Sequence, residues 1–387
     1  MKKKRRVLGI TGIRSEYEHI SNVFRAIRNH ENLELEIVVT GAHLSEAYGR
    51  TVDEVRSDGF IIVDEIESLI NSDQASSRVK GLSVQLQGLV QTVSRVQPDI
   101  LIVLGDREEA MTTALVGSYM NIPVAHIGGG DRVVGNVDDQ IRHAVSKLSH
   151  LHFTITAESE ERLIRLGEQP FRIYNVGSPS LDRLLETPHI SMSDISKNLS
   201  FPILKGEPFI MLIQHALSTE IDQSYEQMCI TLEAIEELSL KTLISYPNSD
   251  AGGQKMIKAL QEFSSLPFMH IAKNLPRLEF VNAMRNASCL VGNSSAGIVE
   301  APLLKLPVVN VGRRQYGRLH SENVKFVNHD KEEIKSAIHQ AVYNEEYRNF
   351  VSNCVNPYGD GNSADKIADI IGSITLDKNL LIKDITY

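Results

Sequence analysis

The sequence is poor in cysteine and contains no tryptophan: three cysteines are spread over 387 residues. Cys229, Cys289 and Cys354 form no CxxC pair, so the zinc-ribbon and thioredoxin-type redox motifs are excluded. The 13 histidines include no HExxH motif, which excludes that class of zinc protease. Sparse, widely spaced thiols are typical of proteins of a reducing cytoplasm, and we therefore expect a cytoplasmic protein.

Long apolar runs and excess positive charge are also missing. No stretch approaches the roughly 18 apolar residues that a transmembrane helix needs. The formal net charge is −9, which argues against a general binder of nucleic acids or anionic membranes. Residues 1–6 are basic, but the apolar run at 7–13 is too short for a signal peptide, so we interpret it as a solvated terminus followed by a first strand.

What the sequence does contain is a regular alternation of short apolar runs and helical patterns. In the first half, strands are predicted at 7–13, 35–40, 100–104, 124–127, 153–156 and 173–176, with helices at 21–29, 82–93 and 108–119. After a polar stretch at 187–207, strands are predicted at 209–213, 242–246, 268–271, 289–291 and 308–311, and helices at 224–238 and 256–263. Such alternation predicts parallel sheets with crossover helices.

The fold expected from this pattern is α/β, with two Rossmann-like domains. We expect an N-terminal domain at 1–178, a C-terminal domain at 179–362, and a final helix and tail at 363–387 that could pack on either half. Because ligands of such folds bind at the carboxyl ends of parallel strands, the active site is expected in the cleft between the domains.

Polar residues follow several predicted strands of the first half. Arg14 and His43 follow the first two strands, Asp106 follows the strand at 100–104, and a triple glycine with Asp131 follows 124–127. Carboxylates in a cleft serve as general acids or bases when burial or a like charge raises their pKa. Asp138 begins the next predicted helix and could equally be a first-turn acid; Arg142 lies one turn further along.

The second half contains a candidate phosphate site. Small residues at 292–297, including Ser294 and Ser295, open an apolar helix, where exposed N–H groups favour an anion. The alternative is an ordinary N-cap by either serine. Glu300 could accept from ribose hydroxyls or could be a surface glutamate.

Two further features of this half are also suited to binding a phosphate. His215 follows the strand at 209–213 and could contact phosphate, move protons or be structural. Arg314 and Arg318 follow the strand at 308–311 and suit bidentate phosphate contacts, although a solvated basic loop is the alternative.

These motifs together resemble the hydrolysing UDP-N-acetylglucosamine 2-epimerases of bacterial sialic-acid and capsule pathways. The resemblance extends over nearly the whole chain, and its most specific pieces are Gly-Asp-Arg at 105–107, the DDQIRH run at 138–143, Gly-Asn-Ser-Ser at 292–295 and the RQYGR run at 314–318. It implies a glycosyltransferase-B-type fold, a homodimer or homotetramer in the cytoplasm, and a reaction without metal or redox cofactor.

The resemblance also implies roles for individual residues. The UDP phosphates would be held by Arg14, His215, Ser294 and Ser295, with Glu300 on the ribose. Asp106 and Asp138 match the family's acid–base carboxylates, and Arg142 matches its cation near the diphosphate. The implied reaction is anti elimination of UDP across C1–C2, followed by hydration of the glycal to give N-acetylmannosamine.

Gly128 departs from the family pattern, in which many members carry a glutamate and some a histidine. Either Asp131 takes over a role, or the site accepts an altered sugar such as the 2,4-diacetamido-2,4,6-trideoxy sugar of legionaminic-acid pathways. Three competing functions fit the same fold: a non-hydrolysing 2-epimerase, a retaining glycosyltransferase, and a nucleotide-sugar binder without catalysis.

Overall fold

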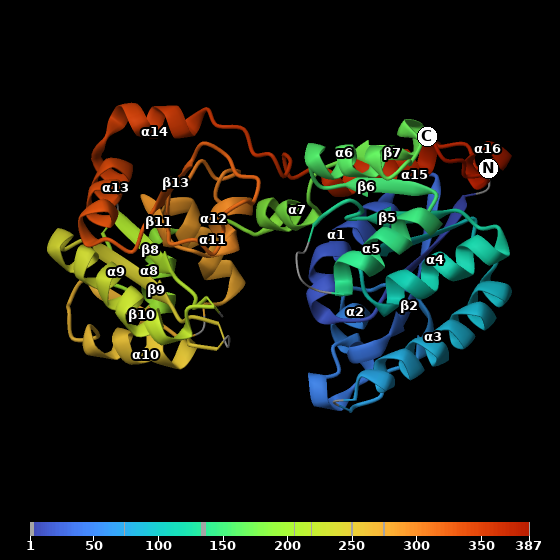
Figure 1. Cartoon of the computed structure of the whole chain (residues 1–387), viewed down its shortest axis with the longest axis horizontal. Helices are drawn as coiled ribbons and strands as arrows, with labels where there is room; N and C mark the ends of the chain where they lie inside the picture. The colour runs from blue at the N-terminus through green and yellow to red at the C-terminus, as the bar shows by residue number, and fades with distance from the viewer. Residues whose placement is uncertain are drawn as a thin grey trace. The chain divides into compact units, whose positions relative to one another are not determined.

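The computed structural model describes residues 4–72, 74–132, 137–204, 206–217, 219–248, 251–273 and 275–386. The chain forms two compact α/β units (Figure 1). The first contains residues Met1–Arg183 and Tyr358–Tyr387, and the second contains Leu184–Pro357. The first boundary falls inside helix α7 (Pro179–Glu186).

The first unit is built on a seven-stranded parallel sheet with the order β3-β2-β1-β4-β5-β6-β7. Its strands are β1 (Arg5–Thr11), β2 (Leu33–Thr40), β3 (Ile62–Ile66), β4 (Ile100–Leu104), β5 (Val124–Ile127), β6 (Leu151–Thr154) and β7 (Ile173–Asn175). Its α-helices are α1 (Arg14–Asn29), α2 (Val52–Ser57), α3 (Ala75–Val96), α4 (Glu108–Met120), α5 (Val137–Leu148), α6 (Ala157–Arg165), α15 (Ser363–Ser373) and α16 (Lys378–Leu381).

The second unit is built on a six-stranded parallel sheet with the order β10-β9-β8-β11-β12-β13. Its strands are β8 (Phe209–Ile213), β9 (Lys241–Ser245), β10 (Met269–Ala272), β11 (Cys289–Gly292), β12 (Val308–Val311) and β13 (Val324–Val327). Its α-helices are α8 (Met192–Leu199), α9 (Ser224–Leu238), α10 (Gly253–Glu262), α11 (Arg277–Asn286), α12 (Ser295–Val299), α13 (Lys331–Tyr343) and α14 (Glu345–Ser352).

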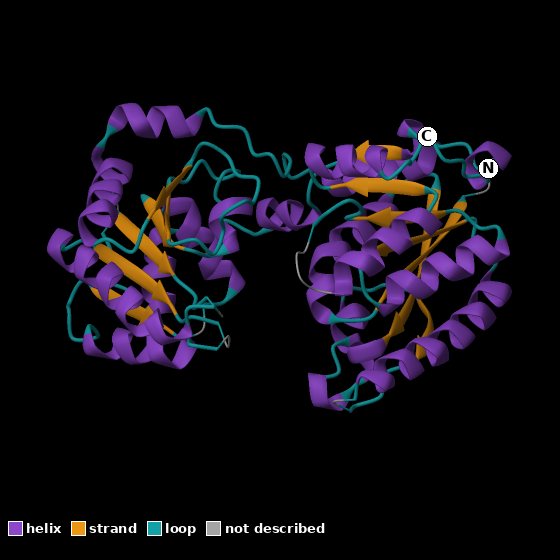
Figure 2. Ribbon diagram, viewed as in Figure 1, coloured by secondary structure: helices purple, strands orange, loops and turns teal. Residues whose placement is uncertain are grey.

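Helices cover both faces of each sheet (Figure 2), and the strand sequences explain why. Successive side chains of a strand point to opposite faces. Accordingly, Val7 of β1 joins a buried cluster with Phe24 of α1 and Ile371 of α15, whereas its neighbour Leu8 joins a second cluster with Leu89 of α3. A sheet buried on both faces needs strands that are apolar throughout, which is the pattern of β4 and β8.

The fold class predicted from the sequence is confirmed: both units are parallel α/β domains. The predicted bounds of β4, β5, β8 and β12 agree with the structure. The last long helix, α15, packs against α1 in the first unit, where the Arg5 guanidinium donates to the carbonyl of Ile374 over 2.7 Å. Among the described residues, every helix is too short or too polar to cross a bilayer.

Two strands of the sheets were not predicted. β3 and β13 are edge strands, and each carries charged residues, Asp64 and Glu65 in β3 and Lys325 in β13. An edge strand has one partner and a more exposed surface, so its sequence lacks the continuous apolar run that identifies a central strand.

Candidate active site

The carboxyl ends of β4 and β5 place Asp106 beside Gly128. Gly105, which follows β4, donates its N–H to the carbonyl of Ile127 over 2.9 Å, so the two strand ends lie side by side. Arg142 reaches both from α5: its Nη1 donates to the Gly128 carbonyl over 2.7 Å, and its Nη2 pairs with the Asp106 carboxylate. The structure thus brings together an acid and a cation that the sequence predicted separately.

Burial determines the electrostatics of Asp106. Removal from water raises the pKa of its carboxyl above the ordinary value, and the nearby charge of Asp138 raises it as well. The guanidinium groups of Arg142 and Arg107 act in the opposite direction. Asp106 is therefore a stronger base than an exposed aspartate, which is the property a proton-abstracting group requires.

Asp138 lies in the first turn of α5, one helical turn before Arg142. Arg78 of α3 approaches it, with Nη2 3.8 Å from Asp138 Oδ1, and pairs closely with Glu108 at the start of α4. Arg78 therefore links one predicted acid–base carboxylate to a neighbouring helix.

A cavity of about 370 Å³ borders this arginine in the first unit. Its wall includes Leu69, Ile70, Arg78, Leu82, Gln85 and Glu108. The volume lies within the range of small-molecule sites, and the wall combines apolar and charged side chains.

Asp131 lies against the start of α6. Ser159 Oγ donates to Asp131 Oδ1 over 2.5 Å, and Arg162 Nη1 donates to the Gly130 carbonyl over 2.8 Å. The triple glycine is thereby fixed to α6, and a catalytic role for Asp131 stays a prediction.

The backbone conformation at Gly128 favours glycine. Its φ is +81°, a conformation that other residues rarely adopt, and a Cβ built there would lie 3.4 Å from Arg142 Nη1 and 3.8 Å from Ile155 Cδ1. Arg142 and Ile155 thus already border the position that a side chain would occupy. This geometry gives little support to the idea that the missing side chain enlarges the sugar site.

The other two predicted binding residues of this unit differ in accessibility. His43 is fully buried, with Nε2 3.1 Å from Thr11 Oγ1 and Nδ1 2.7 Å from Thr51 Oγ1. Burial lowers the pKa of His43 to about 4, so the ring is neutral near pH 7, and its contacts favour a structural role. Arg14, by contrast, is largely exposed, pairs with Glu18 over 3.3 Å and lines a cavity of about 420 Å³.

In the second unit, Asn293 organises the strand ends around His215. The Asn293 side chain accepts from the His215 N–H over 2.7 Å and donates to the His215 carbonyl over 3.0 Å. The Asn248 N–H donates to His215 Nδ1 over 3.0 Å. Because Nδ1 accepts, the proton of the neutral ring lies on Nε2, where it can be donated to a phosphate oxygen.

Gly292 and Ser294 shape the turn between β11 and α12. Gly292 has a φ of +117°, and a Cβ there would lie only 2.2 Å from the Ile213 carbonyl oxygen of β8. Ser294 is the N-cap of α12, and its Oγ accepts from the Ala296 N–H over 3.3 Å. The N-cap predicted as the alternative is therefore present at Ser294, and this contact does not conflict with phosphate binding, because the hydroxyl can still donate its own proton.

The basic loop after β12 packs on the same turn. Arg314 Nη1 and Gln315 Nε2 both donate to the Asn293 carbonyl, over 3.2 and 2.9 Å, and Arg318 Nη1 donates to Gln315 Oε1 over 3.0 Å. Glu300 ends α12, and its burial raises its pKa against the opposing charges of Arg277 and Arg318. The structure thus gathers His215, Ser294, Arg314 and Arg318 at one edge of the second sheet.

Sequence reasoning missed the roles of Asn293 and Arg78. In the sequence Asn293 is only one member of the Gly-Asn-Ser-Ser motif, and its bonds to His215 depend on two strands that pair in the fold. No motif in the sequence points to Arg78, because its partners Glu108 and Asp138 lie 30 and 60 residues away. Only the folded chain brings these residues together.

Comparison with known proteins identifies the family. The family described as UDP-N-acetylglucosamine 2-epimerase matches residues 25–372. The chain belongs to this family of epimerases. A relative from Legionella pneumophila, named UDP-N,N'-diacetylbacillosamine 2-epimerase (hydrolyzing), is 34% identical over 99% of this chain and 100% of its own. A UDP-N-acetylglucosamine 2-epimerase from Neisseria meningitidis is also 34% identical, over 87% of each chain.

Solved structures of the epimerase fold confirm the architecture. A UDP-GlcNAc 2-epimerase from Neisseria meningitidis, solved with UDP-GlcNAc bound, superposes with a TM-score of 0.76 and 21% identity, covering 95% of this chain and 99% of the other. The UDP-GlcNAc 2-epimerase from Methanocaldococcus jannaschii superposes with a TM-score of 0.75 and is 20% identical, with the same coverage of both chains. The glycosyltransferase-B-type fold implied by the resemblance is thereby confirmed.

Proposed function

We propose that this epimerase hydrolyses a UDP-2-acetamido sugar with inversion at C2, releasing UDP and the free 2-epimer. The observation that supports it most directly is the cluster formed by Asp106, after β4, with Asp138 and Arg142 of α5. It combines a carboxylate of raised pKa, a second carboxylate nearby and a buried cation, which suit proton transfer beside a negatively charged leaving group.

The reaction proceeds in two steps. A carboxylate of the Asp106–Asp138 pair takes the proton from C2, the C–H electrons form a C1=C2 double bond, and the C1–O bond breaks with loss of UDP. Water then adds to the glycal, with its hydroxyl on C1 and a proton delivered to C2 from the opposite face. Arg142 stabilises the charge on the departing diphosphate.

The second unit supplies the contacts to UDP in this proposal. His215 Nε2 and the Ser294 and Ser295 hydroxyls donate to phosphate oxygens, Arg314 and Arg318 add positive charge, and Glu300 accepts from the ribose. Arg14 of the first unit also contacts a phosphate. Hydrogen bonds to a charged partner are worth about 1.5–3 kcal/mol each, so the loss of a single donor should weaken UDP binding measurably.

For the sugar, we propose UDP-N,N'-diacetylbacillosamine as the preferred substrate. The Legionella relative carries that name and aligns over the full chain, and a Campylobacter jejuni relative named GDP/UDP-N,N'-diacetylbacillosamine 2-epimerase (hydrolyzing) is 32% identical. We further propose that the cavity beside Arg78 receives the substituents at C4 and C6; its wall includes Leu69 and Ile70, which suit a methyl group.

UDP-N-acetylglucosamine is the second candidate substrate, with N-acetylmannosamine as the product. It is supported by the Neisseria relative of equal identity. A role in making sialic-acid or capsule sugars is part of this second proposal, and a relative from Escherichia coli named polysialic acid biosynthesis protein P7 is 30% identical.

One experiment separates these proposals. The protein is incubated in D₂O with each nucleotide sugar, and the products are followed by NMR. Free UDP together with a C2-deuterated 2-epimer is expected, with the larger kcat/KM for the diacetamido sugar. Equal or faster turnover of UDP-N-acetylglucosamine would reverse the substrate order. An intact epimeric nucleotide sugar indicates a non-hydrolysing enzyme, reaction only with an added acceptor indicates a glycosyltransferase, and unchanged substrate indicates a binder.

A further inference from the structure

The segment that follows α15 returns to the first unit and is held there by Arg172. This arginine is fully buried, although it lies in a short turn before β7. Its guanidinium donates to the carbonyls of Asn379 over 2.9 Å and Ile382 over 2.5 Å, and also to that of Leu380. These contacts fix the end of α16 and Ile382, the residue that directly precedes Lys383.

Lys383 inserts its ammonium group at the C-terminal end of α5. Its Nζ lies 3.0 Å from the Ser146 carbonyl oxygen, 2.8 Å from that of Lys147 and 2.5 Å from that of Ser149. The last carbonyls of a helix lack partners within the helix, and a cation there also interacts favourably with the helix dipole. Lys383 therefore satisfies the end of the helix that carries Asp138 and Arg142.

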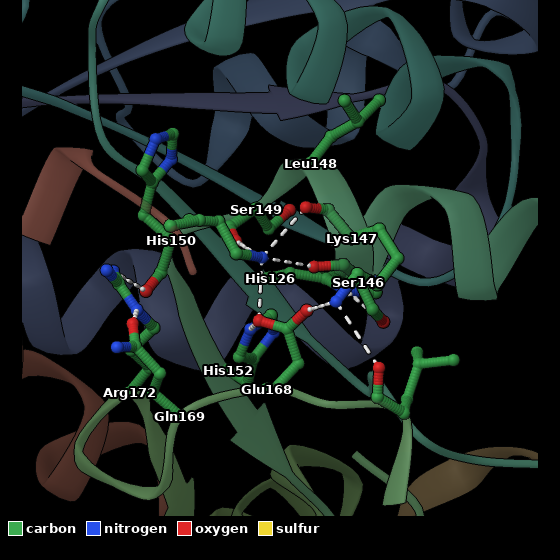
Figure 3. Close-up of polar contacts among 12 residues, drawn as sticks. His126, Ser146, Lys147, Leu148, Ser149, His150, His152, Glu168, Gln169 and Arg172 are labelled. Carbon is green, nitrogen blue, oxygen red and sulfur yellow. Dashed lines mark hydrogen bonds and ion pairs between the residues drawn. The ribbon is translucent and has the colours of Figure 1, made fainter. Parts of the chain in front are cut away.

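A buried carboxylate completes the site (Figure 3). Glu168 has no exposed surface, and its Oε2 lies 2.7 Å from Lys383 Nζ and 2.9 Å from His152 Nε2, while its Oε1 lies 2.8 Å from Lys147 Nζ. Burial alone would raise the pKa of Glu168, but these donors hold it at about 2, so the carboxylate is ionised. Burial lowers the pKa of Lys383 to about 8, which leaves it charged at neutral pH.

The same end of α5 is connected to the loop that carries Asp106. Ser146 Oγ lies 3.4 Å from His126 Nδ1, and His126 Nε2 lies 2.7 Å from the carbonyl oxygen of Gly105 (Figure 3 shows His126 beside Ser146). A shift of the α5 end would therefore displace Arg142 along the helix. Through His126 it would also displace the backbone that precedes Asp106.

We propose that Lys383 is a positioning residue, which holds the C-terminal end of α5 so that Asp138 and Arg142 stay aligned with Asp106 in the elimination step. The proposal rests on the proposed function. Lys383 acts through the helix and touches no substrate; replacing it removes the cation from three carbonyl oxygens and leaves Glu168 with one fewer counter-charge.

The test compares two variants. K383M keeps the approximate length of the side chain but removes its charge, whereas K383R keeps the charge and the donors. K378M is the matched control, because Lys378 lies in the same segment with an exposed side chain. For K383M we expect kcat of UDP release to fall roughly tenfold or more, since small displacements of catalytic groups are costly. Most of the contacts proposed for UDP lie in the second unit, and the first unit adds only Arg14 and Arg142, so the inhibition constant of UDP should change much less than kcat, by about threefold at most. K383R should recover most of kcat, and K378M should match the wild type.

A second readout does not depend on activity. Amide hydrogen exchange in the last two turns of α5 should be faster in K383M and unchanged in K378M. Unchanged exchange, or faster exchange with wild-type kcat, would overturn the proposal, as would an equal loss of kcat and UDP affinity. If K383M does not fold, K383Q is compared with K383R in the same assays. A wild-type chain that releases UDP from neither nucleotide sugar refutes the proposed function and the catalytic part of this proposal, while the exchange data still decide whether Lys383 holds α5.

Discussion

At the scale of single residues, the site depends on how Arg142 and burial balance each other at Asp106. The aspartate is partly buried, which favours its neutral form, and the arginine favours the ionised form. Sequence alone could identify both side chains, because Asp106 lies in the Gly-Asp-Arg motif and Arg142 in the DDQIRH run. It could not give the sign of the net shift, which depends on the water excluded by the folded chain.

This balance predicts a shift in the pH profile. As the proposed base, Asp106 must be ionised to accept a proton, so activity is expected to fall as the pH drops through its raised pKa. R142Q removes the opposing charge and is expected to raise that pKa further, so the acid limb of kcat/KM moves to higher pH. R142K keeps the charge and should move the limb less. The measurement is UDP release from pH 4 to 9; an acid limb that stays in place in R142Q would show that it does not report Asp106.

At the scale of elements, the parts that were predictable are those whose sequence is locally consistent. β4 and β8 are apolar throughout and were predicted with their correct bounds, since both faces of a central strand are buried. The edge strand β3 contains Asp64 and Glu65 and was missed. The helix predicted at 21–29 begins at Arg14 in the structure. The prediction started too late because the first turn of this helix is polar and lacks an apolar stripe.

The turn between β11 and α12 gives a prediction on stability. G292A introduces a Cβ 2.2 Å from the Ile213 carbonyl oxygen at a φ of +117°, so β11 must move away from β8. G206A is the control, because Gly206 also has a positive φ, +84°, but nothing lies within 4 Å of its Cβ position. Backbone strain alone costs about 1–3 kcal/mol, so we expect G206A to lose that amount and G292A clearly more. Urea unfolding measures both, and equal losses would mean that the strand ends adapt to the methyl group.

Helix α3 supplies a prediction on substrate choice. Leu82 lines the cavity beside Arg78, whereas Val84 lies on the same helix, exposed and outside that wall. L82W should reduce kcat/KM for the diacetamido sugar more than for UDP-N-acetylglucosamine, because an indole fills space that the extra substituents need. V84W should leave the ratio of the two values unchanged. A ratio that is equally unchanged in L82W would exclude this cavity from sugar selection.

At the scale of the whole molecule, the two units contribute different parts of one reaction in our proposal. The first would supply Asp106 and Asp138 as acid–base carboxylates, and the second would supply most of the donors for UDP. The two-domain architecture was predictable from the restart of the strand–helix alternation. The return of the chain's last segment to the first unit was not, because α15 is amphipathic and its apolar face could have packed on either sheet.

This division predicts that binding and chemistry can be separated by mutation. D106N should abolish UDP release, with a loss of roughly 10²–10⁴-fold in kcat, while UDP still binds. S294A should instead weaken UDP binding by about tenfold or more, because a hydrogen bond to a charged group is lost, with a smaller effect on kcat. S191A is the control for the loss of a helix cap, since Ser191 caps α8 in the same unit. UDP affinity is measured by calorimetry and kcat by UDP release. If D106N weakens UDP binding as much as S294A does, or if S191A reproduces the effect of S294A, the assignment of phosphate binding to the turn after β11 fails, because the loss would then follow from general destabilisation rather than from a missing donor.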